Sequence, residues 1–351
     1  MSNRVLGREF VVHGLIYVWL AWIDLRLKLY TTPNWFNGTL ASSHASLLRY
    51  SHTNNEQSRL LQFYVPELFH RTLALSIEHS YILQRFLFVA LAFICFHLYL
   101  RRWFDARVSF CGVLLLAAII PFTFHIGDLQ ESSPLLLLTF LLGLWTIRED
   151  RKILIATVFL IGGINNETML ILPLVYFLYN FVALDVRHLV ILCRDTLLVS
   201  LPMVVVVGTI RYVNRDRPVL GGRWQLSHNL EGLVSGNFLF WGFIFIFGIL
   251  WVYALLQYER KPAFLKRAFL ITPIFIVAHL VAGIIHEVRL MLPLSFIVIP
   301  MALSTFTLMS PRILGWRLHR EANIARSRLR KLARSRSSRG RQERSRPHLL
   351  R

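Results

Sequence analysis

The sequence is poor in charged residues and in cysteine, and it lacks the motifs of several large enzyme classes. Charged residues make up 17% of its 351 positions, whereas a soluble domain carries about 25%, so the charge content argues against a soluble globular fold. The three cysteines show no pairing pattern, and we expect neither disulfides nor a cysteine-based metal site. The sequence also contains no P-loop, no HExxH motif and no glycine-rich dinucleotide motif, so no cofactor is indicated.

Hydrophobic residues dominate the chain instead and make up 55% of it. They form continuous runs close to the length of about 20 residues that crosses a bilayer. We therefore predict an all-α polytopic membrane protein with about ten transmembrane helices. The first run is interpreted as an uncleaved helix because no small-residue cleavage site follows it, and the fifth is either shallow or broken at Gly162-Gly163. The ten expected spans are 9–29, 80–100, 107–123, 132–147, 152–164, 168–184, 189–210, 238–258, 267–285 and 290–309.

The connections between these spans are of two alternating kinds. One kind is basic, and the positive-inside rule places it in the cytoplasm. With ten spans, both termini are then cytoplasmic as well, and we expect a multi-pass protein of a bacterial plasma membrane. The basic connections contain Arg101, Arg102, Arg107, Arg148, Arg151, Lys152, Arg187, Arg194, Arg260, Lys261, Lys266 and Arg267.

Residues 311–351 are predicted to form an arginine-rich tail behind a transmembrane helical domain of residues 1–310. The tail carries fourteen basic and two acidic residues, which is +12 of the net charge of +20. We expect it to be largely disordered, to lie in the cytoplasm and to contact anionic lipid there. No nucleic-acid partner is expected, because no binding module accompanies the tail and aromatic residues are absent after Trp316.

The other kind of connection lies on the outer side and includes two long segments. The first, residues 30–79, mixes apolar and charged residues between Glu56 and Arg71. This pattern predicts a helix that lies in the membrane interface and is kinked near Pro66. The second long connection, residues 211–237, is an exception to the charge rule. It contains Arg211, Arg215, Arg217 and Arg223.

Two short outer connections place a carboxylate beside histidine or asparagine. Asp128, which lies between His125 and Glu131, is a cap of the next helix in one interpretation, and the functional alternative for this group is a general base or metal ligand that faces an external substrate. Glu167 follows Asn166 at the expected start of a helix, where capping and the helix dipole account for both residues. Substrate binding is the alternative for this pair.

A third short outer connection carries Glu287 and Arg289. On a continuing helix these two side chains would not face each other, so each would contact a ligand or another loop. The alternative is a local ion network at the interface.

Five isolated charged residues complete the set of candidates. Four arginines are candidates for phosphate contacts, because a guanidinium group binds phosphate oxygens in pairs, with attraction to anionic headgroups as the alternative; they are Arg59, Arg215, Arg217 and Arg223. Asp24 lies near the outer end of the first span and is a candidate site residue. Its alternative role is to pair with Lys28, four residues on.

Several of these stretches resemble the polytopic glycosyltransferases of the GT-C type, which use sugars linked to polyprenyl phosphate. The segment Glu56-Gln-Ser-Arg59 and its continuation to Pro66 are similar to the first-loop interfacial helix of bacterial members. Gly127-Asp128-Leu-Gln-Glu131 is similar to their second external acidic motif. Segments 163–173 and 287–293 resemble recurring segments of bacterial membrane proteins allied to that group. The likeness covers the layout of residues 10–308.

The resemblance implies transfer of a hexose or pentose from a lipid-phosphate carrier to an acceptor on the non-cytoplasmic face. A carboxylate would deprotonate the acceptor hydroxyl, with Asp128 as the first choice and Asp24 or Glu56 next. Many members carry an acidic pair early in the first external loop, and residues 30–39 contain no acid here. A divalent metal is compatible with this chemistry but is not indicated. The residues implied to bind substrate or to neutralise the departing phosphate are His125, Asn166, Glu167, Glu287, Arg289, Arg59 and Arg223.

Two other classes of function fit the same pattern. A transporter or flippase is the first, although such proteins often show inverted repeats and broken helices near the bilayer midplane, whereas the polar groups here lie near span ends. The second is a non-catalytic membrane scaffold of the same fold, which the missing acidic pair favours.

Overall fold

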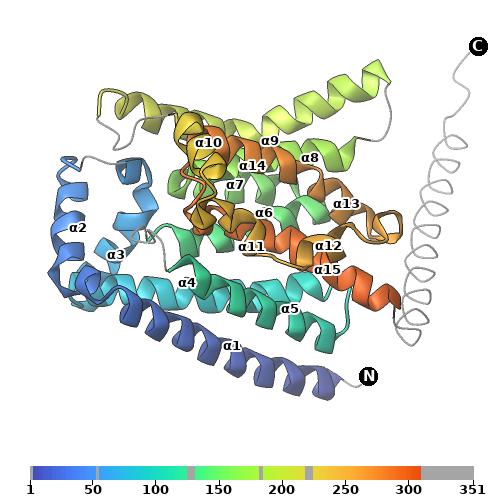
Figure 1. Cartoon of the computed structure of the whole chain (residues 1–351), viewed down its shortest axis with the longest axis horizontal. Coiled ribbons are helices and arrows are strands. Elements are labelled where there is room, and N and C mark those ends of the chain that lie inside the picture. Colours follow the sequence, from blue (N-terminus) through green and yellow to red (C-terminus); the bar gives the residue numbers. More distant parts are fainter. Residues whose placement is uncertain (1–2, 53–54, 125–130, 182–184, 218–223, 310–351) are drawn as a thin grey trace, which may run out of the picture. The chain divides into compact units, whose positions relative to one another are not determined.

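The computed structural model describes residues 3–52, 55–124, 131–181, 185–217 and 224–309, and these segments form helices and turns without any strand. The expectation of an all-α protein is therefore confirmed within these ranges. The chain divides into two compact units, Met1–Leu303 and Ser304–Arg351. The described part of the second unit is the end of the last helix, and every other described residue belongs to the first unit (Figure 1).

The helices are numbered in chain order and joined by short 3-10 or π-helical turns. The α-helices are α1 Asn3–Thr31, α2 Leu40–Leu48, α3 Leu60–Leu73, α4 Ile77–Leu100, α5 Ala106–Ile119, α6 Ser133–Glu149, α7 Lys152–Asn165, α8 Leu172–Asn180, α9 Val186–Val213, α10 Leu226–Val234, α11 Gly242–Phe245, α12 Leu250–Leu255, α13 Ala263–Phe269, α14 Ile271–Ala282 and α15 Ser295–Met309. The short turns are η1 Trp35–Thr39, η2 Asn55–Ser58, η3 Ile120–Thr123, η4 Glu167–Ile171, η5 Phe238–Trp241, η6 Tyr258–Arg260 and η7 Val288–Leu294.

Five helical segments among the described residues are long and apolar enough to cross a membrane. They are Ile77–Leu100, Ala106–Thr123, Val186–Val213, Ala263–Ala282 and Val288–Leu308. The chain is accordingly consistent with a multi-pass membrane protein. The expected count of about ten spans is not confirmed.

Of the other five expected spans, 9–29 lies within the continuous helix α1, and the remaining four are short or interrupted. The helix α7, at 14 residues, falls short of the roughly 20 that cross a bilayer. It nevertheless continues through Gly162-Gly163, so the break considered at this pair is absent. The expected span 238–258 is divided into η5, α11 and α12, and Gly248 between the last two adopts a φ of 45°, which favours glycine.

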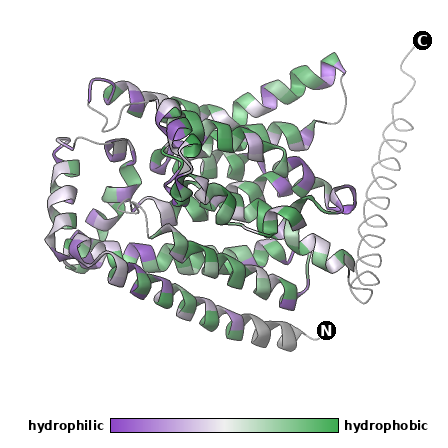
Figure 2. Cartoon of the chain, in the orientation of Figure 1, coloured by the Kyte–Doolittle hydropathy of each residue, from purple (hydrophilic) through white to green (hydrophobic). Residues whose placement is uncertain are grey.

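The helices pack in a chain of neighbours from α1 to α9. The first helix packs on α4, α4 on α5 and α6, α6 on α7, and α7 on α9. The hydrophobic core includes Phe96 of α4 and Phe296 of α15, whose rings meet at a centroid distance of 5.1 Å. Figure 2 shows that hydrophobic residues cover most of these helices and that hydrophilic ones gather at the turns.

The basic connections gather at one end of these helices, on the right in Figure 1. Arg102, after α4, lies 3.5 Å from Glu149 at the end of α6, and Lys152 at the start of α7 lies 2.5 Å from Asp195 of α9. Each ion pair joins residues from two different segments at this end of the helices. This agrees with the expectation that the basic connections lie on one side of the protein.

Lys261 stands apart from the other residues at this end because it is buried. Only 4% of it is exposed, and its Nζ donates to the carbonyl oxygens of Tyr253, Ala254 and Met301 at 2.7, 2.7 and 2.8 Å. Carbonyl groups at a helix end lack intrahelical donors. Lys261 donates hydrogen bonds to two such carbonyls at the end of α12 and therefore does not contact a lipid headgroup.

The first long connection, residues 30–79, folds into helices at the opposite end, where α2 and α3 are drawn in blue in Figure 1. The predicted helix between Glu56 and Arg71 is present as α3, which continues through Pro66. It exposes Tyr64 and Leu68 while Phe63 is buried, an arrangement typical of a helix at an interface. The helix α2 was not anticipated from the sequence.

Close packing of α7 against α9 depends on Gly163. A Cβ atom added there would lie 2.7 Å from Met203 Cγ and 3.1 Å from Val207 Cγ2, both on α9. We expect Gly163→Val to lower the free energy of unfolding by about 1–3 kcal/mol, because overpacking forces side chains off their rotamers. The measurement is unfolding in detergent micelles, followed by far-ultraviolet circular dichroism.

Gly208 on α9 is the matched control, because no atom lies within 4 Å of an added Cβ there. Gly208→Val is expected to change the free energy of unfolding by less than about 0.5 kcal/mol, since valine and glycine differ little in helix propensity. Equal effects of the two substitutions would contradict the packing role of Gly163.

Candidate functional site

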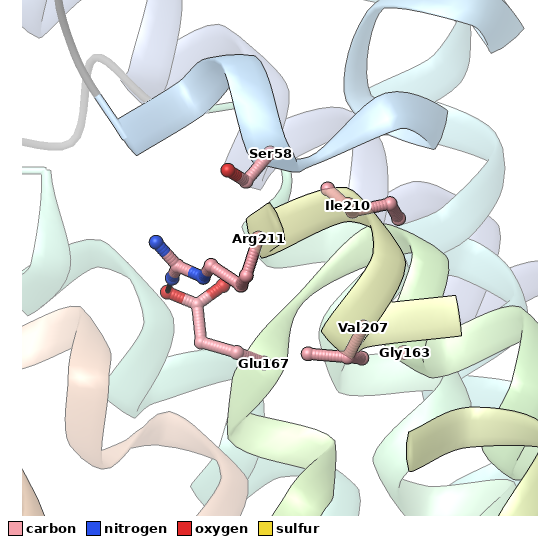
Figure 3. A pocket seen from close by; sticks show the side chains of 6 residues that line it. All are labelled: Ser58, Gly163, Glu167, Val207, Ile210 and Arg211. Atoms are coloured by element: carbon pink, nitrogen blue, oxygen red, sulfur yellow. Dashed lines mark ion pairs between the residues drawn. The ribbon is translucent and has the colours of Figure 1, made fainter. Parts of the chain in front are cut away.

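Glu167 lies between two arginines that come from distant parts of the chain. Its Oε1 is 3.4 Å from Nη2 of Arg59, which precedes α3, and 2.8 Å from Nη2 of Arg211 near the end of α9. Figure 3 shows the Arg211 guanidinium group over the Glu167 carboxylate. The two cations lower the pKa of Glu167 to about 2, although burial by itself would raise it.

The local sequence explains how Glu167 reaches this position. The helix α7 ends at Asn165, and Asn166 has an extended backbone that starts the turn η4. The Asn166 side chain accepts a hydrogen bond from the backbone N–H of Thr168 at 2.9 Å, which is the capping role considered for it. Asn166 therefore positions Glu167, and its predicted role in substrate binding stays a prediction.

A small pocket opens beside this ion pair. It holds about 180 Å³ of empty space, including open solvent at its mouth. Much of this space is open to solvent, and the enclosed part has room for about one water molecule, so the pocket is a small hollow beside the ion pair and not a preformed site for a phosphate or a sugar. Its lining residues are Ser58, Gly163, Glu167, Val207, Ile210 and Arg211 (Figure 3).

Glu56 lies on the same side of the molecule and has the opposite electrostatic character. Only 5% of it is exposed, and this burial raises the pKa of its carboxyl group, against the opposing effects of Arg59, His52 and Arg289. Arg59 thus acts on both carboxylates. We call Glu56, Arg59, Glu167, Arg211 and Arg289 the Glu167 cluster.

The connection that carries Arg289 differs from the expectation. Glu287 and Arg289 were expected not to face each other, but Glu287 Oε2 lies 2.5 Å from Arg289 Nη2. The expectation was wrong because the backbone is not a continuing α-helix here: Glu287 is non-helical and starts the 3-10 turn η7. Glu287 and Arg289 thus form a local ion pair, and the Arg289 guanidinium group acts electrostatically on Glu56.

Asp24 belongs to a second group of buried charges, which lies among α1, α4 and the start of α6. Asp24 and Lys28 are one turn apart on α1 and expose 3% and 0% of their surface. Arg85 Nη1 of α4 lies 3.0 Å from Glu131 Oε2. Lys28 and Arg85 both contact the ring of Phe124, at 5.6 and 5.0 Å from its centroid. We call Asp24, Lys28, Arg85 and Glu131 the Arg85 cluster.

Three predicted site residues lie outside the described residues, namely His125, Asp128 and Arg223. Two other arginines of the second long outer connection have partners away from the pocket. Arg215 pairs with Asp216 at 3.4 Å, and Arg217 donates to the backbone oxygen of Tyr50. Among the candidates that the structure describes, Glu56, Arg59, Glu167 and Arg289 come together, and Asp24 does not join them.

Two functional candidates were missed by reading the sequence. Arg211 was counted only as an outer-loop charge, yet it is part of α9 and approaches Glu167 more closely than Arg59 does. His279 of α14 is within electrostatic reach of Glu167 and Arg59. The available signal was a charged or polar residue near the end of a long apolar run, where such groups face the protein interior more often than lipid.

Within the described residues, no three histidine, cysteine, aspartate or glutamate side chains are arranged to hold a metal ion. Comparisons with protein-family models, with curated proteins and with solved structures find no match to this chain. The chemistry of the Glu167 cluster therefore carries the functional proposal.

Acid should weaken the structure through Glu167. Its folded pKa of about 2 lies below its ordinary value of 4.5, so the ionised form adds stability above pH 4.5 that is lost as the pH falls toward 2. We expect the wild type to lose about 2 kcal/mol between pH 6 and pH 3 from this group. Unfolding in detergent at both pH values checks this, with Glu167→Gln as the control. A variant with the same acid sensitivity as the wild type would rule out this contribution.

Proposed function

We propose that this protein is a membrane glycosyltransferase that moves a sugar from a lipid-phosphate carrier to an acceptor on the non-cytoplasmic face. The observation that supports it is the Glu167 cluster. Glu167 and Arg211 line a small pocket, Arg59 pairs with Glu167, and Arg59 and Arg289 act electrostatically on the buried Glu56. The pKa of Glu56 is raised and that of Glu167 is lowered. Pairs of carboxylates with separated pKa values are typical of acid–base sites.

In this proposal Glu56 is the general base and Glu167 is not. The acceptor oxygen attacks the anomeric carbon, its proton passes to the Glu56 carboxylate, and the bond between that carbon and the phosphate oxygen breaks. The electron pair of that bond stays on the lipid phosphate. Arg211 and Arg59 neutralise the departing phosphate, and Glu167, which stays ionised, holds the two guanidinium groups apart and oriented.

The proposed topology follows the basic connections. We propose about ten spans, with both termini and the arginine-rich tail of residues 311–351 in the cytoplasm and the Glu167 cluster outside. The bilayer would be a bacterial plasma membrane, and the tail would contact its anionic lipid. Asp128 is not needed as the base when Glu56 serves, although it stays a candidate for contact with the acceptor.

A non-catalytic scaffold of the same fold is the second candidate. It is favoured by the ion pairs that Glu167 and Glu287 already make within the protein and by a pocket of only about 180 Å³. A transporter of lipid-linked sugar is the third class that fits.

The test is transfer of radiolabelled sugar from a synthetic polyprenyl-phosphate donor by the purified protein in lipid vesicles. We expect product with the wild type and a loss with Arg211→Gln, with Arg215→Gln as a matched control because Arg215 lies away from the pocket and pairs with Asp216. Donor that crosses the bilayer without product would identify a transporter. Neither product nor movement of the donor would support the scaffold.

A further inference from the structure

The helix α10, which follows α9 and precedes η5 in the chain, is attached to the rest of the protein by hydrogen bonds of its Asn229 side chain. Asn229 is fully buried. Its amide nitrogen donates to the carbonyl oxygens of Leu280 and Gly283, both at 2.7 Å, and its amide oxygen accepts from the backbone N–H of Ile285 at 3.0 Å. One side chain thus satisfies three backbone groups at the end of α14, where unpaired carbonyls are otherwise costly.

Gly232 lies on the same face, three residues after Asn229, and allows close contact. An added Cβ atom would come within 2.4 Å of the Phe240 ring. The hydrogen bonds of Asn229 and the close packing at Gly232, one turn later, therefore fix the rotation of α10 about its own axis.

The face of α10 that points away from the protein is apolar. Leu226, Leu230 and Val234 follow one another at intervals of four residues, which places them on one side of a helix. Their exposed fractions are 42%, 47% and 87%. Ser227 and Glu231 are also exposed, on a third face. A helix in water would bury its leucines and expose its asparagine, and α10 does the reverse.

Exposed aromatic residues flank α10 on both sides. Trp224 precedes it, and Phe238, Trp241 and Phe245 follow it, with exposed fractions of 76%, 66%, 38% and 53%. Tryptophan is enriched at membrane–water interfaces because its ring is amphipathic. Arg215, just after α9, lies over the ring of Tyr212, 4.2 Å from its centroid.

We propose that α10 and its flanking aromatic residues form an interfacial surface that binds the lipid bilayer at the boundary between headgroups and acyl chains. The occupant is the bilayer rather than a second copy of the chain, because α10 follows α9 in the chain after a connection of only twelve residues, 214–225. The helix α9 has the length and composition of a membrane span and exposes Val204 and Val205. The three faces of α10 then meet protein, acyl chains and water.

The interfacial surface of α10 would set how deep the Glu167 cluster lies in the bilayer. This inference does not depend on the proposed glycosyltransferase function. Asn229 fixes α10 to Ile285, which precedes the Glu287–Arg289 ion pair by a few residues, and Arg211 lies on α9 just before the connection to α10. With α10 at the headgroup boundary, the pocket opens at the level of lipid phosphates.

Spin labels test the proposal. Leu230→Cys and Glu231→Cys are made in a background without the free cysteines Cys95, Cys111 and Cys193, labelled with a nitroxide, and placed in phosphatidylcholine nanodiscs. Collision rates with oxygen, which concentrates among acyl chains, and with a water-soluble nickel chelate are compared by electron paramagnetic resonance. We expect the oxygen-to-nickel ratio at position 230 to be several-fold higher than at position 231.

Two results would overturn the proposal. Equal ratios at both positions would show that α10 lies in water. Low access of both reagents at position 230, together with spin–spin broadening, would show that a second copy covers the face. Both substituted positions are exposed and leave Asn229 and Gly232 intact, and a single peak in size-exclusion chromatography confirms the fold of each variant.

Discussion

Replacing Glu131 by glutamine is expected to lower the free energy of unfolding by about 3–5 kcal/mol, the cost of breaking a buried ion pair. Arg85 and Glu131 expose 3% and 1% of their side chains and lie 3.0 Å apart. Lys28 contacts the same Phe124 ring as Arg85, and the buried Asp24 lies one turn before Lys28 on α1, so the Arg85 cluster has two charges of each sign. Removing either member of the pair alone leaves a net charge in an apolar environment, where its solvation is poor.

The double variant Arg85→Met with Glu131→Leu is the control for this prediction. It removes one charge of each sign, so the cluster stays neutral, and apolar replacements of buried pairs are often neutral or stabilising. Unfolding of the wild type, the two single variants and the double variant by denaturant in detergent micelles, followed by circular dichroism, gives the coupling energy. A double variant as unstable as Glu131→Gln would show that an uncompensated buried charge is not the cause of the destabilisation.

Replacing Glu56 by glutamine is expected to abolish sugar transfer while stabilising the fold. Under the proposed function the loss of the general base lowers the rate by about 10²–10⁴-fold. The stability effect has a separate cause. Burial raises the pKa of Glu56 above its ordinary value of 4.5, so the folded state binds this proton more tightly than the unfolded state. Ionisation therefore costs stability as the pH rises through the folded pKa.

The pH dependence of stability separates this prediction from ordinary structural damage. Glu56→Gln should be more stable than the wild type at pH values above the folded pKa, and the gain should disappear below pH 4.5. Glu67 on α3 is the matched control, because a hydrogen bond from His44 lowers its pKa. Glu67→Gln should therefore lose stability above pH 4.5. A Glu56→Gln protein that transfers sugar normally would remove Glu56 as the base, whatever its stability.

The parts of the structure that follow from local chemistry could be predicted from the sequence. Long apolar runs gave the all-helical fold, the mixture of apolar and charged residues gave α3, and the asparagine before Glu167 gave a cap. Each of these depends on a few neighbouring residues, whose preferences act within a turn of helix.

The contacts that join distant residues could not be predicted in this way. Arg85 and Glu131 are 46 residues apart, and Arg59 and Glu167 are 108 apart. Which arginine meets which carboxylate depends on how the helices pack, and periodicity does not contain that information. The error at Glu287 and Arg289 is of another kind, because the assumption of a continuing helix was itself wrong.

The burial of Lys261 has a practical consequence for measuring orientation. The chain has five lysines; Lys28 and Lys261 expose 0% and 4% of their surface, and Lys331 lies outside the described residues. The side chains of Lys152 and Lys266 are 51% and 24% exposed, and both belong to the basic connections at one end of the helices. In the described part of the chain, the exposed lysines therefore lie at one end of the helices only. The extent of their labelling by a membrane-impermeant acylating reagent would show which end of the protein faces the outside of a sealed vesicle.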